Sequence, residues 1–238
     1  AENAGSALTL TATIGNATFE DVTVSIDGTG GTATEGTDFG TVSDITISAG
    51  ATTGTTSFTP TDDSIYDATS NETAGISVSA VSGGGASENG DQSVTITITD
   101  NESAPTLTLS TSATSIAEDA GSSLTLTATL SNGTYQDVTA ALGTSGTATE
   151  GTDYTDGSGN IDDITISAGS TTGTVSFTPT NDTIDEANET AIIAVTGVSG
   201  GSATESGSQS QTITITDDDS GSFSVADVTV AENAGTAT

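Results

Sequence analysis

The sequence predicts an all-β protein built from β-sandwich modules in tandem, and three observations support this prediction. A segment that begins AENAGSALTLTATI at Ala1 recurs as AEDAGSSLTLTATL from Ala117 and opens again as AENAGTAT at Ala231. The repeat lengths are therefore 117 − 1 = 116 and 231 − 117 = 114 residues, which is the size of a domain and not of a solenoid unit. Apolar residues alternate with Thr and Ser, and clusters of Gly, Ser, Asn and Asp separate the alternating segments. No segment has the apolar periodicity of a helix of useful length.

The individual strands follow from this period of two, most clearly in the second copy. Leu124, Leu126 and Ala128 alternate with Thr, and Ile213 and Ile215 do the same near the end of the copy; such alternation is typical of half-buried strands. Seven short strands in about 115 residues indicate an immunoglobulin-like fold. The fold prediction is thus tandem seven-stranded immunoglobulin-like antiparallel β-sandwiches. The strands, named A to G, are expected at residues 106–116, 123–130, 136–142, 163–167, 173–178, 190–197 and 209–216.

Aromatic residues occupy matching positions in the two copies. Their agreement favours a shared packing role, in the core or at its rim, because aromatic side chains bury large apolar areas. The matched pairs are Phe19 with Tyr135, Phe39 with Tyr154, and Phe58 with Phe177.

The repeat boundaries predict the domain organisation. We expect residues 1–104 to form a module without its first strand, residues 105–219 a complete module, and residues 220–238 the first strand of a following module. This arrangement indicates part of a continuous array. Insertion of the terminal strand into the first module of another subunit is the less favoured alternative, because AENAG stands at both Ala1 and Ala231 and an inserted strand would not need that duplicate.

The charge composition excludes several classes of partner. The chain has 33 Asp and Glu residues and no Lys, Arg or His, so its formal net charge is −33. Nucleic acids and anionic membrane surfaces both attract proteins through cationic side chains, and we expect neither as a partner. No stretch approaches the roughly 18 apolar residues of a membrane span. Clustered carboxylates repel one another by about 4 kcal/mol at 4 Å and an effective dielectric near 20, so their counter-ion must come from solution.

The acidic residues of the second copy gather at one end of the predicted sandwich. The A–B, C–D and E–F loops and the end of strand G share one pole, because strands A, C, E and G run in the same direction. Only Glu205, at the opposite pole, and Asp137, on a strand, lie elsewhere. A solvated acidic face is the usual explanation of a charge run, but here four separate loops converge. The residues at this acidic pole are Glu118, Asp119, Glu150, Asp153, Asp156, Asp162, Asp163, Asp182, Asp185, Glu186, Glu189, Asp217, Asp218 and Asp219.

Convergent carboxylates without Cys or His predict a site for a hard cation. Ca²⁺ takes six to eight oxygen ligands in flexible geometry, which loops can supply, whereas Mg²⁺ requires stricter octahedral order. Soft metals are disfavoured because the chain has no thiolate or imidazole. We therefore predict Ca²⁺ as the bound ion.

The order of these motifs also resembles the Calx-beta domain. The resemblance rests on a Glu after strand A, a GTDY motif, an E–F loop of the form D-x-I-x-E-x-x-E and a terminal Asp run, and it covers essentially the whole chain. The family is named for sodium–calcium exchangers and also occurs in integrin β4 and in large bacterial surface proteins. It implies a seven-stranded sandwich that binds calcium at the distal loops. For the second module the resemblance implies as ligands Glu118, Asp153, Asp182, the Ile184 backbone carbonyl, Glu186, Glu189, Asp217, Asp218 and Asp219. For the first module it implies Glu2, Asp38, Asp62, Asp63, the Ile65 backbone carbonyl, Asp67, Glu72, Asp100 and Glu102.

Some positions depart from the family pattern. Asn181 stands where the family often has an acid. In the first module Asn101 interrupts the terminal acidic run, and the E–F loop is two residues longer. We therefore expect fewer or weaker ions in the first module.

The residue types present argue against an enzyme. Without His, Cys, Lys or Arg, the usual nucleophile–base pairs cannot be built. Two carboxylates could hydrolyse a glycoside, but aromatic residues make up only 3% of the chain and Trp is absent, so no platform for sugar stacking exists.

The function predicted from the sequence is a calcium-binding structural repeat of a secreted cell-surface protein or extracellular fibre, in which calcium at the domain junctions makes the array rigid. Its expected partners are neighbouring modules of the same chain and, in a fibre, identical chains. Two alternatives remain open, an adhesin that binds a partner through the sandwich surface and a calcium-sensing regulatory domain. A mechanical array predicts many near-identical copies, whereas an adhesin predicts a divergent terminal module.

Overall fold

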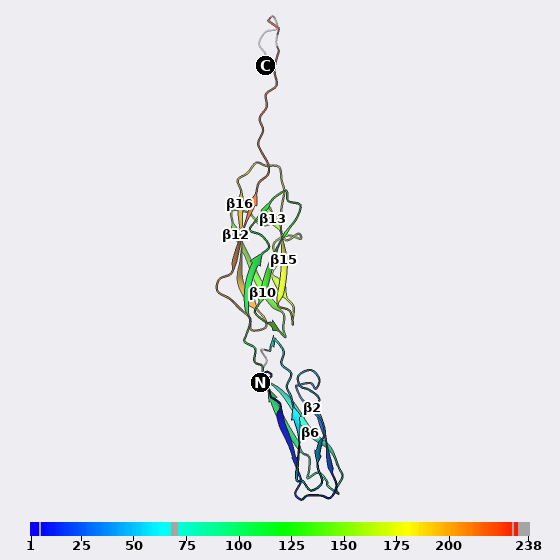
Figure 1. Ribbon diagram of the computed structural model, residues 1–238. Coiled ribbons are helices and arrows are strands. Elements are labelled where there is room, and N and C mark those ends of the chain that lie inside the picture. The colour runs from blue at the N-terminus through cyan, green and yellow to red at the C-terminus, as the bar shows by residue number, and fades with distance from the viewer. Residues whose placement is uncertain (5, 68–70, 230, 233–238) are drawn as a thin grey trace.

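The computed structural model describes residues 1–4, 6–67, 71–229 and 231–232. These residues form two β-sandwich modules arranged end to end, and residues 220–229 run away from the second module in an extended conformation (Figure 1). The prediction of tandem all-β sandwiches is confirmed. No helix among the described residues is long and apolar enough to span a membrane.

The second module consists of two five-stranded sheets packed face to face. Its core alternates along each strand, with Leu107, Leu126 and Ile213 fully buried and their Thr neighbours facing outward. The first sheet has the strand order β13 (Tyr154–Thr155), β15 (Thr172–Pro179), β10 (Leu124–Leu130), β8 (Thr106–Thr111) and β17 (Thr204–Glu205). The second sheet has the order β14 (Ile164–Ile166), β12 (Val138–Gly146), β16 (Glu189–Ser199), β18 (Ser210–Thr216) and β9 (Ser115–Ala117).

The predicted first strand, 106–116, is in fact two strands in different sheets. β8 pairs antiparallel with β10, whereas β9 pairs parallel with β18. The chain crosses between the sheets at residues 112–114. One continuous strand was a wrong expectation, because the alternating pattern of a sequence does not show where a strand changes its pairing partner.

The predicted third strand, 136–142, is also longer than expected and reaches Gly146. Its register shifts at a bulge between Ala141 and Leu142. The Leu142 N–H donates to Asp163 Oδ1 at 2.8 Å, so Asp163 lies beside the bulge in the strand rather than at the acidic pole, where we expected it. The first module repeats this contact, with the Ile26 N–H donating to Asp44 Oδ1 at 3.0 Å.

Two of the three matched aromatic pairs form the core, as predicted. Tyr154 and Phe177 stack with ring centroids 4.7 Å apart, and the corresponding rings of the first module stack at 4.8 Å. The third pair differs from the prediction, because Phe19 is fully exposed and Tyr135 lies at the surface.

The first module repeats the second, but among its described residues no strand corresponds to β8, β9, β13 or β17. In the described residues, the outer edge of its first strand therefore has no strand partner. A cleft of about 750 Å³ opens beside that strand and is lined by Leu10, Ala12, Ile14 and Val78 among others. In its first sheet β1 (Leu8–Thr13) pairs with β4 (Thr53–Phe58). Its second sheet has the strand order β3 (Ile45–Ile47), β2 (Val22–Gly31), β6 (Glu72–Ser82) and β7 (Ser93–Ile98).

A short parallel ladder joins the two modules. β5 (Ile65–Tyr66), in the E–F loop of the first module, pairs with β11 (Gly133–Thr134), in the B–C turn of the second. The Tyr135 hydroxyl donates to Asp63 Oδ2 at 3.2 Å across this junction. The Asn132 side-chain amide also donates to the Ser103 carbonyl at 3.2 Å, which ties the turn to the linker at residues 99–105.

Candidate metal centre

Three carboxylates meet at the acidic pole of the second module. Glu118 directly follows β9 and Asp217 directly follows β18, and the parallel register Thr216↔Ala117 sets these two acids side by side. Oxygen atoms of Glu118, Asp217 and Asp219 all lie within 4.8 Å of one another. We call this group the second-module triad.

The first module has the same arrangement. Oxygen atoms of Glu2, Asp100 and Glu102 lie within 4.8 Å of one another, and the Glu2 N–H donates to the Thr99 carbonyl at 3.0 Å. We call this group the first-module triad. Figure 1 places the N-terminus near the junction between the modules, so the first-module triad lies at that junction.

Several oxygen atoms in these triads are buried and have no hydrogen-bond partner among the residues that the structure describes. They are Glu118 Oε1, Asp217 Oδ1 and Asp219 Oδ2 in the second module, and Glu2 Oε2 and Glu102 Oε2 in the first. A buried charged oxygen without a partner is costly and is normally paired or bound to a metal ion. These oxygens therefore fit a cation bound by oxygen ligands.

The same crowding changes the protonation of the triads. Burial, followed by the Asp217 and Asp182 carboxylates, raises the pKa of Glu118 to about 7. Burial, followed by Asp63 and Asp100, raises the pKa of Glu2 to about 7 as well. The folded protein thus keeps these groups partly protonated near neutral pH unless a cation compensates their charge.

The E–F loop closes over each triad through backbone hydrogen bonds to carboxylates. In the second module the Glu186 N–H donates to Asp217 Oδ2 at 3.2 Å, and the Ile184 N–H donates to Asp182 Oδ1 at 2.7 Å. The first module repeats both bonds, at 3.1 Å to Asp100 and 2.7 Å to Asp63. The bonds to Asp217 and Asp100 therefore tie the loop that carries several implied ligands to the triad of each module.

A second group of acids lies beside each triad. Burial, then Asp153 and Glu186, raise the pKa of Glu189, and the corresponding shift of Glu72 arises from burial, then Asp38 and Asp67. In the second module a small cavity joins this group to the triad. Its lining includes Glu118, Asp153, Asp182, Glu186, Glu189 and Asp217.

Other implied ligands belong to neither triad. Asp62 and Asp218 are exposed; desolvation, then the neighbouring Asp119, raise the pKa of Asp218. Ile184 has a half-exposed side chain, and Ile65 belongs to the junction ladder. Glu150, at the pole by prediction, holds its own loop by accepting hydrogen bonds from the Ile161 N–H and the Thr144 hydroxyl.

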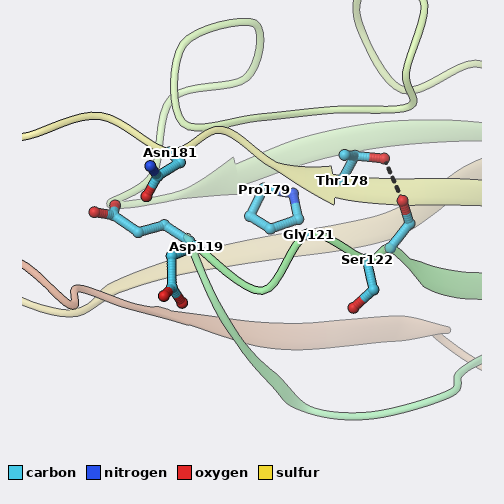
Figure 2. Close-up of a pocket in the computed structure, with 8 residues that line it drawn as sticks. Asp119, Gly121, Ser122, Thr178, Pro179 and Asn181 are labelled. Carbon is cyan, nitrogen blue, oxygen red and sulfur yellow. Dashed lines mark hydrogen bonds between the residues drawn. The ribbon is translucent and has the colours of Figure 1, made fainter.

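An open cavity of about 250 Å³ adjoins the second-module triad (Figure 2). Figure 2 shows Asp119 and Asn181 near one end of it and Thr178 near the other. Thr178 and Ser123 share a hydrogen bond of 2.7 Å between their hydroxyls. Because Glu118 also lines the cavity, this opening gives water and ions a path to the triad.

Tyr135 is the functional candidate that sequence reasoning missed. Burial, followed by Asp63, raises the pKa of its hydroxyl to about 12, so it remains a hydrogen-bond donor to an implied ligand of the other module. The aligned Phe19 was the available signal, because the added oxygen of Tyr135 occurs in only one of the two copies.

Comparison with known proteins shows the family. The Calx-beta domain family matches residues 1–102 and again residues 100–219. The chain therefore belongs to the Calx-beta family and contains two such domains in tandem.

Solved structures with a similar fold include the apo form of the Calx CBD1 domain, at 18% identity over 48% of this chain and 99% of that chain, with a TM-score of 0.39. The CBD12 tandem of CALX1.2 is similar at 14% identity over 90% of this chain and 94% of that one, with a TM-score of 0.38. Invasin, a bacterial integrin-binding protein, is similar at 16% identity over 91% of this chain and 37% of that one, with a TM-score of 0.41. No curated protein sequence gave a significant match.

Proposed function

We propose that this chain is a calcium-stiffened structural repeat of a secreted cell-surface protein or extracellular fibre. The observation that supports the proposal most directly is the set of buried carboxylate oxygens without partners in both triads. The chain contains no Lys, Arg or His that could pair with them, so a cation from solution has to compensate their charge.

Calcium suits these residues better than other ions. The available ligands are carboxylate and backbone oxygens on loops, and Ca²⁺ accepts six to eight such ligands in flexible geometry. In the second module the triad and Asp182 would hold one ion, and Asp153, Glu186 and Glu189 would contribute to a second position. When bound, the ion supplies positive charge that removes the repulsion among these acids.

Calcium in the first module would act on the junction between the modules. The E–F loop that bears Asp63 and Asp67 also contains β5, which pairs with β11 of the next module. Glu102 of the first-module triad lies in the linker. An ion that fixes this loop and this linker therefore restricts bending at the junction.

An extracellular location accords with this mechanism. Extracellular calcium-binding modules have dissociation constants of about 0.1–1 mM, so they are loaded outside the cell and empty at cytosolic calcium concentrations. A structural site that depends on such weak binding works only where calcium is abundant.

Thermal unfolding of the 238-residue chain tests the proposal. Melts are recorded with EDTA, with millimolar CaCl₂ and with equal MgCl₂. A site at one hundred times its dissociation constant adds about 2.7 kcal/mol, so we expect calcium to raise Tm strongly and magnesium much less. An unchanged Tm in calcium would overturn the proposal.

A matched variant identifies the site. Glu118→Gln with Asp217→Asn and Asp219→Asn keeps the shapes of the side chains and removes three charges from the second module. This variant should lose the calcium response of the second module and keep that of the first. A full response in the variant would show that calcium binds elsewhere.

A further inference from the structure

The B–C turn that joins the two modules contains the pair Asn132–Gly133. Asn is followed by Gly at two places in the chain, here and at Asn89–Gly90. Asn is chemically labile, because the backbone nitrogen of the next residue can attack its side-chain amide. Gly hinders this attack least, since it has no Cβ. The junction thus contains one of the two most reactive Asn positions of the chain.

Neither of the usual reasons for a glycine applies at Gly133. Its φ is not positive. A Cβ at this position would lie 3.4 Å from the Gly169 carbonyl oxygen, which is an ordinary contact. The matching turn of the first module has Ala17 here, after Asn16. The fold therefore accepts alanine at this position, and the glycine instead suits the reactivity of the Asn before it.

The side chain of Asn132 is arranged for this reaction. Its amide nitrogen donates to the Gly133 carbonyl at 3.5 Å and to the Ser103 carbonyl at 3.2 Å, so it lies along the backbone of the attacking residue. The Ser131 hydroxyl donates to Asn132 Oδ1 at 2.9 Å. A donor at this oxygen stabilises the negative charge that develops there when the amide carbon is attacked. The first module has Gly15 in place of this serine.

We propose that Asn132 is a deamidation site and that its conversion permanently loosens the junction between the modules. The Gly133 backbone nitrogen loses its proton to hydroxide and attacks Asn132 Cγ. The new N–Cγ bond closes a cyclic imide, the Cγ–Nδ2 bond breaks, and ammonia leaves. Water then opens the imide at one of its two carbonyls and gives aspartate or isoaspartate. The sum is amide plus water to carboxylate plus ammonium, so no oxidant or other reactant is needed.

The product does not fit the contacts that hold the turn. A carboxylate at position 132 cannot donate to the Ser103 carbonyl, so two acceptors face each other without a proton between them. Its charge also enters the turn that carries Tyr135, whose hydroxyl donates to the Asp63 carboxylate, and like charges repel. Isoaspartate in addition lengthens the backbone directly before β11, which disturbs its pairing with β5. Both products therefore weaken the junction.

The ladder controls when the reaction occurs. Gly133 is buried and pairs with Ile65 of the first module, so its nitrogen can turn onto Asn132 Cγ only while the B–C turn is out of the ladder. Deamidation therefore follows opening of the junction and prevents full closure afterwards. The molecule becomes more flexible with age at one defined place. The reaction uses no carboxylate of either triad and does not rest on calcium binding.

Peptide mapping by mass spectrometry follows the reaction in the 238-residue chain, aged in EDTA at mildly alkaline pH. We expect aspartate and isoaspartate to accumulate at position 132, more slowly than at Asn89, which lies in an exposed turn. Asn16 should keep its amide. Tyr135→Phe removes one hydrogen bond across the junction, so it should speed the conversion of Asn132 about five-fold and leave that of Asn89 unchanged.

Gly133→Ala is the matched control, because it keeps Asn132 and fits the turn. This variant should retain most of its amide at position 132 while Asn89 reacts as before. An intact amide at position 132 in the wild-type chain after Asn89 has fully reacted would overturn the proposal. Equal conversion in the wild-type chain and in Gly133→Ala would overturn it as well.

Asn132→Asp tests the effect on the junction without ageing. In EDTA we expect the amides of β5 and β11 to exchange with solvent about five-fold faster than in the wild-type chain, and X-ray scattering to show wider bending. Asn16→Asp is the control, because it adds the same charge to the turn of the first module and should change neither property. Unaltered exchange and scattering in Asn132→Asp would refute the loosening. All these outcomes are read without calcium, whereas the calcium proposal fails on an absent calcium effect on Tm.

Discussion

The two modules share most of their sequence but differ in how well their cores are closed. In the second module the buried apolar side chains form one continuous cluster, whereas the first module divides into two. Leu124 is 9% exposed, and the equivalent Leu8 is 48% exposed. The difference lies in β8 and β9, which place Leu107 and Leu109 on one sheet and Ile116 on the other. The division of the first strand into β8 and β9 thus closes the core of the second module at both sheets.

The acidic poles differ much less than the cores. Both have a triad, the same two E–F loop hydrogen bonds and a partly buried Glu with a raised pKa. The main local change is at Asn101, which stands at the position of Asp218; its side-chain amide donates to Glu102 Oε1 at 2.8 Å. The geometry of the pole therefore does not depend on a closed core, because the backbone that follows the last strand of each module, β7 or β18, positions two of the three acids of the triad.

The largest expected effect comes from adding counterparts of β8 and β9 to the first module. A second copy of residues 103–116, fused to the N-terminus at Ala1, supplies the equivalents of Leu107, Leu109 and Ile116 to the cleft beside β1. Full burial of each such side chain contributes about 1.5–3 kcal/mol, and ordering the segment offsets part of this gain. A net gain of about 3 kcal/mol would raise Tm of the first module by more than about 10 °C, which calorimetry can measure.

The control for this graft carries Ser in place of Leu107 and Leu109 in the added segment only. It has the same length and charge but cannot fill the cleft. If the graft and its control melt at the same temperature, the contrast in core closure does not explain the stability of the modules.

The second prediction concerns the two triads. Glu118→Gln with Asp217→Asn should remove one ion from the second module, which costs about 2.7 kcal/mol at calcium one hundred times the dissociation constant. Glu2→Gln with Asp100→Asn should cost less, because Asn101 leaves the first-module pole with fewer carboxylates. Calorimetric titration of the two variants gives the stoichiometry and affinity of each module. Equal losses would contradict the expected inequality.

The third prediction concerns pH, and it should affect both modules alike. Glu2 and Glu118 have pKa values near 7 in the folded protein, against an ordinary value of 4.5. Between these values the unfolded chain has lost protons that the folded chain retains, so stability without calcium falls as pH rises from about 4.5 to 7. Calcium needs the ionised groups, so its increment in Tm should grow over the same interval. Melts in EDTA and in calcium at several pH values measure both trends.

If the increase in Tm produced by calcium does not change with pH, Glu2 and Glu118 are not ligands of the ion. Glu118→Gln provides the control, because it removes one titrating group and should flatten the trend of the second module only.

Sequence reasoning predicted the features that repeat locally. The alternation of Leu124, Leu126 and Ala128 indicated a strand, and the parity of the strands placed Glu118 and Asp217 at one pole, where the structure brings them together. The features that depend on pairing between distant segments were not predictable. The division between β8 and β9, the role of Asp163 at the bulge and the ladder of β5 with β11 each follow from register, which no single segment encodes.

The smallest expected effect tests how the modules communicate. Tyr135→Phe removes the hydroxyl that donates to Asp63 across the junction at 3.2 Å and leaves the B–C turn intact. A partner that orients a metal-binding carboxylate affects metal affinity, and a partly exposed hydrogen bond contributes about 1 kcal/mol. We therefore expect calcium affinity of the first module to fall by about five-fold, with the second module unchanged. The matched control is Phe19→Tyr, which adds the same hydroxyl at a fully exposed position and should change neither site. Calorimetric titration measures the affinities, and X-ray scattering of both variants in calcium measures bending at the junction. An unaltered first-module affinity in Tyr135→Phe would show that the ladder alone, without its hydroxyl, holds the E–F loop for the ion.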